Sequence, residues 1–157
     1  MVQLVPMIEK EFTEFLEQSI VRYAEENVRA GYWNAAEALA KARSDHIKIL
    51  PQGLATKNHF LFNIVNTESS EKVGTLFLAS KPADSIDSTG FIYDLFIAEP
   101  YRRKGHAMQA MRAIEQKAKE LGIGKLSLHV FAHNTAAQAL YKKLSYATTS
   151  LNMEKKL

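Results

Sequence analysis

Between residues 91 and 107 an apolar segment runs into a basic turn and then into a helix. Residues 91–98 are apolar nearly throughout, which is typical of a strand buried on both faces, and Pro100 ends them. After the basic turn, the apolar residues from Gly105 onward recur at helical spacing. Because a helix N-terminus carries unpaired N–H groups and the positive end of the helix dipole, this strand–turn–helix unit is suited to hold a phosphate.

The rest of the chain predicts a mixed order of helices and strands. In the first half of the chain we expect a short strand at 4–5, helices over 9–30 and from 34 to before Pro51, and strands over 59–66 and 73–79. In the second half we expect a loop over 81–89, a strand over 91–98, a helix over 105–121 and a strand over 126–131. A short helix after Asn134 and a last strand within 146–155 complete the order. This order predicts one α/β (α+β) domain, residues 1–157, with helices flanking a central mixed sheet.

Composition excludes several protein classes. With 157 residues, 46% of them hydrophobic and 24% charged, the chain can bury an ordinary core and is neither disordered nor collagen-like. Its apolar stretches are far shorter than the ~20 residues of a membrane helix, and its start does not resemble a signal peptide. The absence of cysteine excludes disulfides, thiolate metal sites and a cysteine nucleophile, and it fits a cytoplasmic location.

Two motifs in the second half of the chain resemble those of one enzyme family. Residues 102–107, Arg-Arg-Lys-Gly-His-Ala, are similar to the pyrophosphate loop Gln/Arg-x-x-Gly-x-Gly/Ala of the GNAT family of acetyl-CoA-dependent N-acetyltransferases. Residues 128–146 resemble the family's strand followed by Asn, Ala and Leu-Tyr-x-Lys-x-Gly-Phe/Tyr, although Ser145 stands where glycine is usual. The resemblance implies the GNAT fold, a mixed and mostly antiparallel sheet whose middle strands splay apart.

The resemblance also implies which residues bind acetyl-CoA. The pantetheine arm would pair, like an added strand, with backbone groups of Leu95, Phe96 and Ile97, and Asn134 would hydrogen-bond the same arm. The pyrophosphate would be cradled, mainly through main-chain N–H groups, by Arg102, Arg103, Lys104, Gly105, His106 and Ala107.

A catalytic role is implied for Tyr141, which would protonate the departing thiolate. A tyrosine with its ordinary pKa of about 10 can donate to a developing thiolate whose pKa is about 8.5. General acid catalysis of this kind typically raises the reaction rate roughly 10²–10⁴-fold. A backbone N–H near Leu95 or Phe96 can polarise the thioester carbonyl.

The sequence leaves the general base open. Some family members use a glutamate at the position that Phe91 occupies here, so that role does not carry over. Tyr93, Asp94, His129, a water chain to one of them, or a backbone carbonyl remain candidates.

Several other residues have a structural as well as a functional interpretation. Asn134 is also a candidate helix cap, and Tyr32 and Trp33 can line an acceptor pocket or pack in the core. Glu25 and Glu26 can attract a cationic amine or simply face solvent. The histidines lack metal-ligand spacing with acidic residues, so we expect no metal site.

These observations favour an enzyme that transfers acetyl from acetyl-CoA to a primary amine of a small molecule or peptide by direct attack in a ternary complex. One alternative is a non-catalytic acyl-CoA-binding or regulatory domain on the same fold. Another is a nucleic-acid-binding module, but the net charge of +3 is small and no recognised motif supports it, so neither nucleic acid nor membrane is an expected partner. The resemblance leaves monomer and homodimer open.

Overall fold

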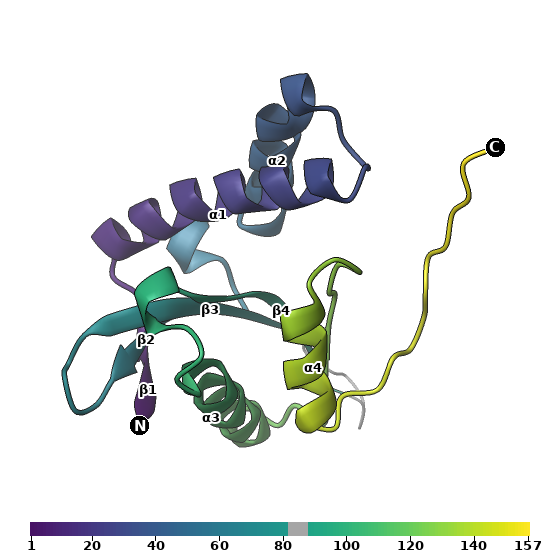
Figure 1. The fold of residues 1–157 in the computed structure, drawn as a ribbon. Coiled ribbons are helices and arrows are strands. Elements are labelled where there is room, and N and C mark those ends of the chain that lie inside the picture. Colours follow the sequence, from purple (N-terminus) through teal and green to yellow (C-terminus); the bar gives the residue numbers. More distant parts are fainter. Residues whose placement is uncertain (82–87) are drawn as a thin grey trace.

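The computed structural model describes residues 1–81 and 88–157 (Figure 1). Its elements are β1 (Val2–Pro6), α1 (Glu9–Arg29), α2 (Ala35–Ile49), η1 (Gly53–Ala55), β2 (His59–Asn66), β3 (Lys72–Lys81), β4 (Thr89–Ile97), η2 (Glu99–Tyr101), α3 (His106–Glu120), β5 (Lys125–Leu128) and α4 (Thr135–Lys143). The helix and strand order through α4 is the predicted one. Residues 82–87 of the expected loop over 81–89 lie outside the described residues.

The strands form one sheet in the order β1-β2-β3-β4-β5. Neighbours from β1 to β4 are antiparallel, whereas β5 is parallel to β4 because the chain crosses over through α3. The pairing of β4 with β5 begins at Thr89 and Lys125 and ends at Ile92 and Leu128. The predicted mixed, mostly antiparallel sheet with splayed middle strands is therefore confirmed.

Helices cover both faces of the sheet (Figure 1). The helix α3 buries Met111 and Ile114 against one face, where they join a core cluster with Leu76, Leu78 and Ile92. Because α3 repeats its apolar residues at helical spacing, one stripe of the helix supplies all of these contacts.

The opposite face of the sheet is covered by α1. Phe12 and Phe15 of α1 pack there on Leu61 and Phe77, and α2 packs in turn on α1. Side chains of β3 thus reach both cores, since successive residues of a strand point to opposite faces.

Two boundaries differ from the sequence prediction. The strand expected within 146–155 is wrong, because residues 146–157 run without a strand partner among the described residues and most of them lie away from the body (Figure 1). The strand expected over 126–131 ends at Leu128. A strand requires a neighbour to satisfy its backbone groups, and an alternating or apolar pattern alone does not supply one. No described helix is long and apolar enough to cross a membrane.

Candidate active site

The parting of β4 from β5 leaves one edge of β4 open. Beyond Ile92, the residues of β4 keep their pairing with β3, but no described strand pairs with their other edge. Leu95, Phe96 and Ile97, the three residues expected to pair with a pantetheine arm, all lie on this open stretch. The backbone groups of this stretch that point away from β3 can therefore accept an extended ligand as a further strand would be accepted, although the Ile97 carbonyl oxygen already accepts a hydrogen bond from Arg102.

A β-bulge beside the open edge changes the direction of two side chains. The register of β3 with β4 shifts so that Phe77 opposes Asp94 and Leu78 opposes Ile92, which leaves Tyr93 as the extra residue. Tyr93 stacks on Phe77 at 5.0 Å between ring centroids, and the next residue, Asp94, pairs with Arg22 of α1. Both side chains thus lie on the α1 side of the sheet, as a bulge permits.

The turn before α3 has the backbone shape of an anion site. Arg103 and Gly105 adopt left-handed conformations, with φ of 63° and 83°. Alternation of this kind directs successive N–H groups inward, and the first N–H groups of α3 lack intrahelical partners. Since α3 begins at His106, the positive end of its dipole adds to the same concavity.

The side chains of this turn mostly brace it. Arg102 donates from Nε to the carbonyl oxygen of Ile97 at 2.8 Å, and Lys104 donates from Nζ to that of Pro100 at 3.0 Å. The side chain of His106 is buried, so it does not face an incoming ligand. Arg102 and Lys104 are thus engaged within the turn, and Arg103 is exposed, so the main-chain role expected for residues 102–107 stays a prediction.

The helix α4 positions the two residues of the second motif. Asn134 caps it, accepting a hydrogen bond at Oδ1 from the N–H of Ala137 at 3.2 Å, so its structural interpretation is correct. Tyr141 is half-buried, and burial together with the nearby Asp94 charge raises the pKa of Tyr141 to about 12. Ser145, after the helix, has a φ of 66°, the left-handed conformation for which glycine is usual.

Asp94 lies at the centre of the site. Its Oδ2 accepts hydrogen bonds from Arg22 Nη2 at 3.1 Å and from Thr75 Oγ1 at 3.4 Å. Burial raises the pKa of Asp94, and the Arg22 guanidinium partly offsets that rise. Of the three side-chain candidates for the base, Asp94 is the one whose charge contributes to the raised pKa of Tyr141, whereas Tyr93 and His129 are exposed.

Arg22 is the residue that the sequence prediction missed. Its guanidinium stacks over the Phe96 ring at 4.0 Å while it binds Asp94, and it lines a shallow groove between α1 and the end of β4. A signal was present in the sequence, because Arg22 stands seven residues after Phe15 and three after Ser19 on the apolar face of α1. A lone cation on a buried helix face is expected to have an acidic partner.

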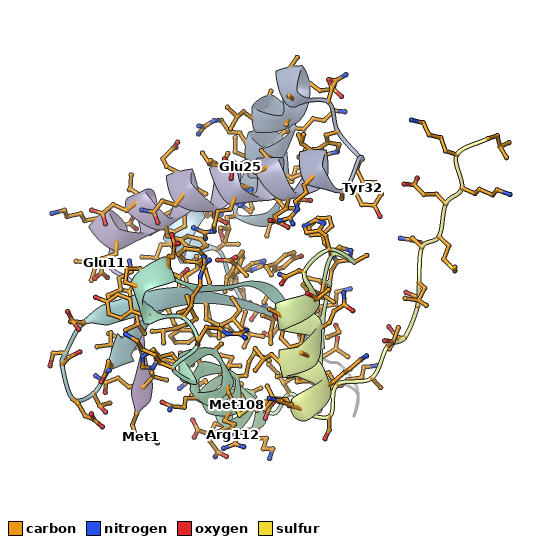
Figure 2. All side chains as sticks on the ribbon, in the orientation of Figure 1. Met1, Glu11, Glu25, Tyr32, Met108 and Arg112 are labelled. Carbon is orange, nitrogen blue, oxygen red and sulfur yellow. The ribbon has the colours of Figure 1, made fainter. Side chains whose placement is uncertain are left out.

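The loop after β5 is tied to the end of α1. His133 hydrogen-bonds Glu26, and the Phe131 ring lies 6.3 Å from that of Tyr32, which is labelled at the α1–α2 turn in Figure 2. Trp33, by contrast, packs edge-on against Tyr23 at 5.3 Å between the helices. Of the two aromatic residues after α1, Tyr32 is exposed beside Phe131, whereas Trp33 packs against the core between α1 and α2.

Two further charged or titratable side chains lie on the helices α1 and α2. Glu25 is exposed on α1. His46 is buried, with Nδ1 at 2.8 Å from the carbonyl oxygen of Ala42 and Nε2 at 3.0 Å from Ser19 Oγ, so it is a satisfied core histidine. Across residues 1–81 and 88–157, no three His, Cys, Asp or Glu side chains are grouped to hold a metal ion.

The chain is similar to known proteins, some of them over its whole length. A family model described as the acetyltransferase (GNAT) family matches residues 23–146. An uncharacterized N-acetyltransferase of Bacillus subtilis (strain 168), YycN, is 40% identical over 99% of both chains, and a crystal structure of this putative acetyltransferase superposes with a TM-score of 0.95 over 100% of this chain and 99% of that one. An L-ornithine N5-acetyltransferase of Arabidopsis thaliana, NATA1, is 32% identical over 44% of this chain and 30% of its own length.

Proposed function

The chain belongs to the GNAT family of acetyltransferases, and on that premise we propose that it transfers acetyl from acetyl-CoA to a primary amine by direct attack. One observation carries the proposal. The edge of β4 opens after Ile92, with Asp94 near the start of the open stretch and the turn before α3, with its left-handed Arg103 and Gly105, following its end. A long ligand with a phosphate at one end and a reacting group at the other fits that arrangement.

The chain's own residues fit acetyl-CoA, which supplies an activated acetyl thioester. The open backbone of Leu95, Phe96 and Ile97 would hold the pantetheine arm, and the N–H groups of residues 102–107 would hold the pyrophosphate. Asn134 uses Oδ1 for its helix cap, which leaves the amide nitrogen to donate to the arm.

Tyr141 would serve as the general acid. Because its pKa lies far above neutral pH, the phenol is protonated there and the proton is in place when negative charge develops on sulfur. The chain has no cysteine, so no cysteine acyl-enzyme can form and the amine attacks the thioester itself.

Asp94 is the favoured proton acceptor, directly or through one water. Burial raises its pKa toward the range that suits a general base, and the bulge turns it to the α1 side. The amine would arrive on that side, where a groove is lined by Glu17, Gln18, Val21, Arg22 and Phe96. The ornithine-acetylating relative supports small cationic amines as the first acceptors to try, and the lack of cysteine supports a reducing compartment such as the cytoplasm.

The test is release of thiol from acetyl-CoA, followed with a thiol-reactive dye across amino acids, polyamines, aminoglycosides and lysine peptides. The cysteine-free protein adds no thiol background. We expect release above the no-amine control with at least one acceptor, and a fall of roughly 10²-fold or more in turnover in Tyr141→Phe. Tyr146→Phe is the matched control, because its ring lies 5.8 Å from that of Tyr141 outside the proposed chemistry. Equal turnover in both variants would remove Tyr141 from the proposed role.

A further inference from the structure

The guanidinium of Arg22 has hydrogen-bonding capacity beyond its contact with Asp94, and it lines the groove on the α1 side of the sheet. We infer that Arg22 binds a carboxylate of the acceptor, so that the acceptor is a free α-amino acid whose carboxylate stands on the carbon that bears the reacting amine. The inference rests on the proposed function, because it names the class of amine that the proposed reaction takes.

Arg22 is held in place by two contacts of different kinds. Its Nη2 donates to Asp94 Oδ2 at 3.1 Å, and its guanidinium carbon lies 4.0 Å from the centre of the Phe96 ring. Most of the side chain is packed, and the remaining part reaches the groove. A cation held in this way does not lose, on binding a ligand, the rotamer freedom that a flexible surface arginine would lose. The guanidinium is therefore preorganised to bind an anion.

The donors of Arg22 outnumber its partners. A guanidinium has five N–H donors in a planar fork, and within residues 1–81 and 88–157 the structure gives this one a single hydrogen bond, to Asp94. The remaining donors can bind a second carboxylate, for which the arginine fork has the matching geometry. Because the second carboxylate would share the cation with Asp94, the pKa of Asp94 would rise further on binding, which makes Asp94 a stronger base.

The other side chains of the groove do not compete with Arg22 for an anion. Among the five described residues that line it, Arg22 is the only cation. Glu17, the one acid, accepts hydrogen bonds from Arg43 of α2, from Nη1 at 2.9 Å and from Nη2 at 3.0 Å, so its charge is balanced locally. The rest of the lining is neutral and consists of Gln18, Val21 and Phe96. A carboxylate entering the groove therefore meets Arg22 as its binding partner.

The short distance between Arg22 and Asp94 fixes how far the carboxylate can stand from the amine. Both side-chain hydrogen bonds that the described residues make to Asp94 go to Oδ2, which leaves Oδ1 for an amine. In an α-amino acid the amine nitrogen lies about 2.5 Å from the carboxyl carbon, as the N–Cα and Cα–C bond lengths require. One such molecule can place its carboxylate on Arg22 and its amine at Asp94 together. A simple amine offers Arg22 nothing, and a peptide N-terminus presents an amide there.

The first test compares acceptors that differ only in the carboxylate. L-leucine, L-phenylalanine and L-glutamine are each measured, by thiol release from acetyl-CoA, beside the corresponding amide and the amine that lacks the carboxyl group. Because the three compounds of a set differ in the pKa of the amine, kcat/KM is expressed per neutral amine. We expect a value at least about tenfold higher for the acid in at least one set, mainly through a lower KM. Amides or amines that react as well as the acids would overturn the inference and leave the proposed function intact.

The second test asks whether Arg22 is the source of that preference. Arg22→Gln removes the cation, and Arg22→Lys keeps the charge without the fork. We expect the preference for the acid over its amide to disappear in Arg22→Gln and to fall in Arg22→Lys. Arg29→Gln, which removes an exposed arginine from the same helix, is the matched control and should keep the preference. Since the preference is a ratio measured on one preparation, a loss of stability does not imitate its disappearance. A preference that survives in Arg22→Gln would overturn the assignment.

A binding measurement distinguishes failure of this inference from failure of the proposed reaction. Calorimetric titration with CoA present compares the N-acetylated acids with their amides and needs no turnover. We expect the acid of at least one set to bind at least about tenfold more tightly than its amide to the wild type, and equally to Arg22→Gln. If this difference is present but no acceptor is acetylated, the proposed function is wrong and the carboxylate site stands. If acids and amides bind alike in every set, the carboxylate site is wrong.

Discussion

At the scale of single residues, the burial of Tyr141 has a consequence for the pH dependence of kcat. Its pKa is raised to about 12 by burial and by the Asp94 charge. A general acid is lost only above its pKa, so the kcat of the wild-type enzyme should show no alkaline fall from this group up to about pH 11. A rate measurement from pH 6 to 10.5 checks this, and a fall with a midpoint near pH 9 would assign the acid role to another group.

The same shift has a consequence for stability. Because the folded pKa of Tyr141 lies above the unfolded value, its contribution is present below pH ~10 and is lost as pH rises toward about 12. Unfolding of the wild type in denaturant should therefore become easier between these values, and Tyr141→Phe should show a smaller change over that interval. Tyr32→Phe, which alters an exposed ring, is the control and should follow the wild type.

This chain has Ser145 where its family usually has glycine, yet the backbone keeps the left-handed conformation that glycine favours. A side chain at its φ of 66° costs roughly 1 kcal/mol that glycine does not. Ser145→Gly should raise the free energy of unfolding by up to about 1 kcal/mol, which corresponds to a Tm increase of about 2–4 °C. Ser145→Ala removes the hydroxyl but keeps Cβ and should give no gain. Equal Tm values for the two variants would show that the turn is not strained.

The positions of the motif residues were predictable because they depend on the local conformation of the backbone. The turn at Gly105 and the cap at Asn134 are local, so the sequence around each contains the necessary information. The pair of Arg22 with Asp94 was not predictable from either motif, because it joins residues 72 positions apart on elements whose packing no local pattern specifies.

At the scale of elements, the close approach of β3 to β4 shapes the site. A Cβ on Gly74 would lie 2.0 Å from the carbonyl oxygen of Phe96, so Gly74→Ala must push the two strands apart. We expect a loss of about 3 kcal/mol or more in the free energy of unfolding, as for severe overpacking, and a weaker hold on acetyl-CoA by the shifted edge. Denaturant unfolding and acetyl-CoA titration measure the two effects.

Gly124→Ala is the matched control for that substitution. Its added Cβ would meet its nearest neighbour, the Ser88 carbonyl oxygen, at an ordinary 3.8 Å. A change of less than about 1 kcal/mol is expected there. If Gly74→Ala were no more destabilising than this control, the close approach of β3 and β4 would not constrain the open edge.

Strands were predicted correctly where a neighbouring strand satisfies their backbone hydrogen-bonding groups. The apolar run of β2 was predicted with its observed bounds, His59–Asn66, and β2 pairs on both sides. The run through Phe131 was too long because β4 diverges after Ile92 and offers no further pairing. Residues 146–155 alternate like a strand but have no strand partner among the described residues, so their pattern predicted an element that the structure does not contain.

At the scale of the whole molecule, the ion pair of Arg22 with Asp94 joins the helical layer to the sheet. Both side chains are mostly buried, at 25% and 22% exposure. Arg22→Met keeps the apolar stem but leaves the Asp94 carboxylate without its cation, and we expect a loss of about 3 kcal/mol at pH 8, at the lower end for a broken buried pair. In Arg22→Met/Asp94→Asn, where no charge is left unpaired, most of that loss should be recovered.

The direction in which the stability loss of Arg22→Met changes with pH distinguishes a lost charge interaction from lost packing. Burial raises the pKa of Asp94, and removing Arg22 takes away the main interaction that opposes the rise. As pH falls through that raised pKa the carboxyl becomes neutral and no longer needs a cation, so the loss in Arg22→Met should shrink toward acid pH. Denaturant unfolding at pH 8 and pH 5 measures the difference. A loss of the same size at both values would mean that the Arg22 stem stacked on Phe96, rather than its charge, holds α1 to the sheet.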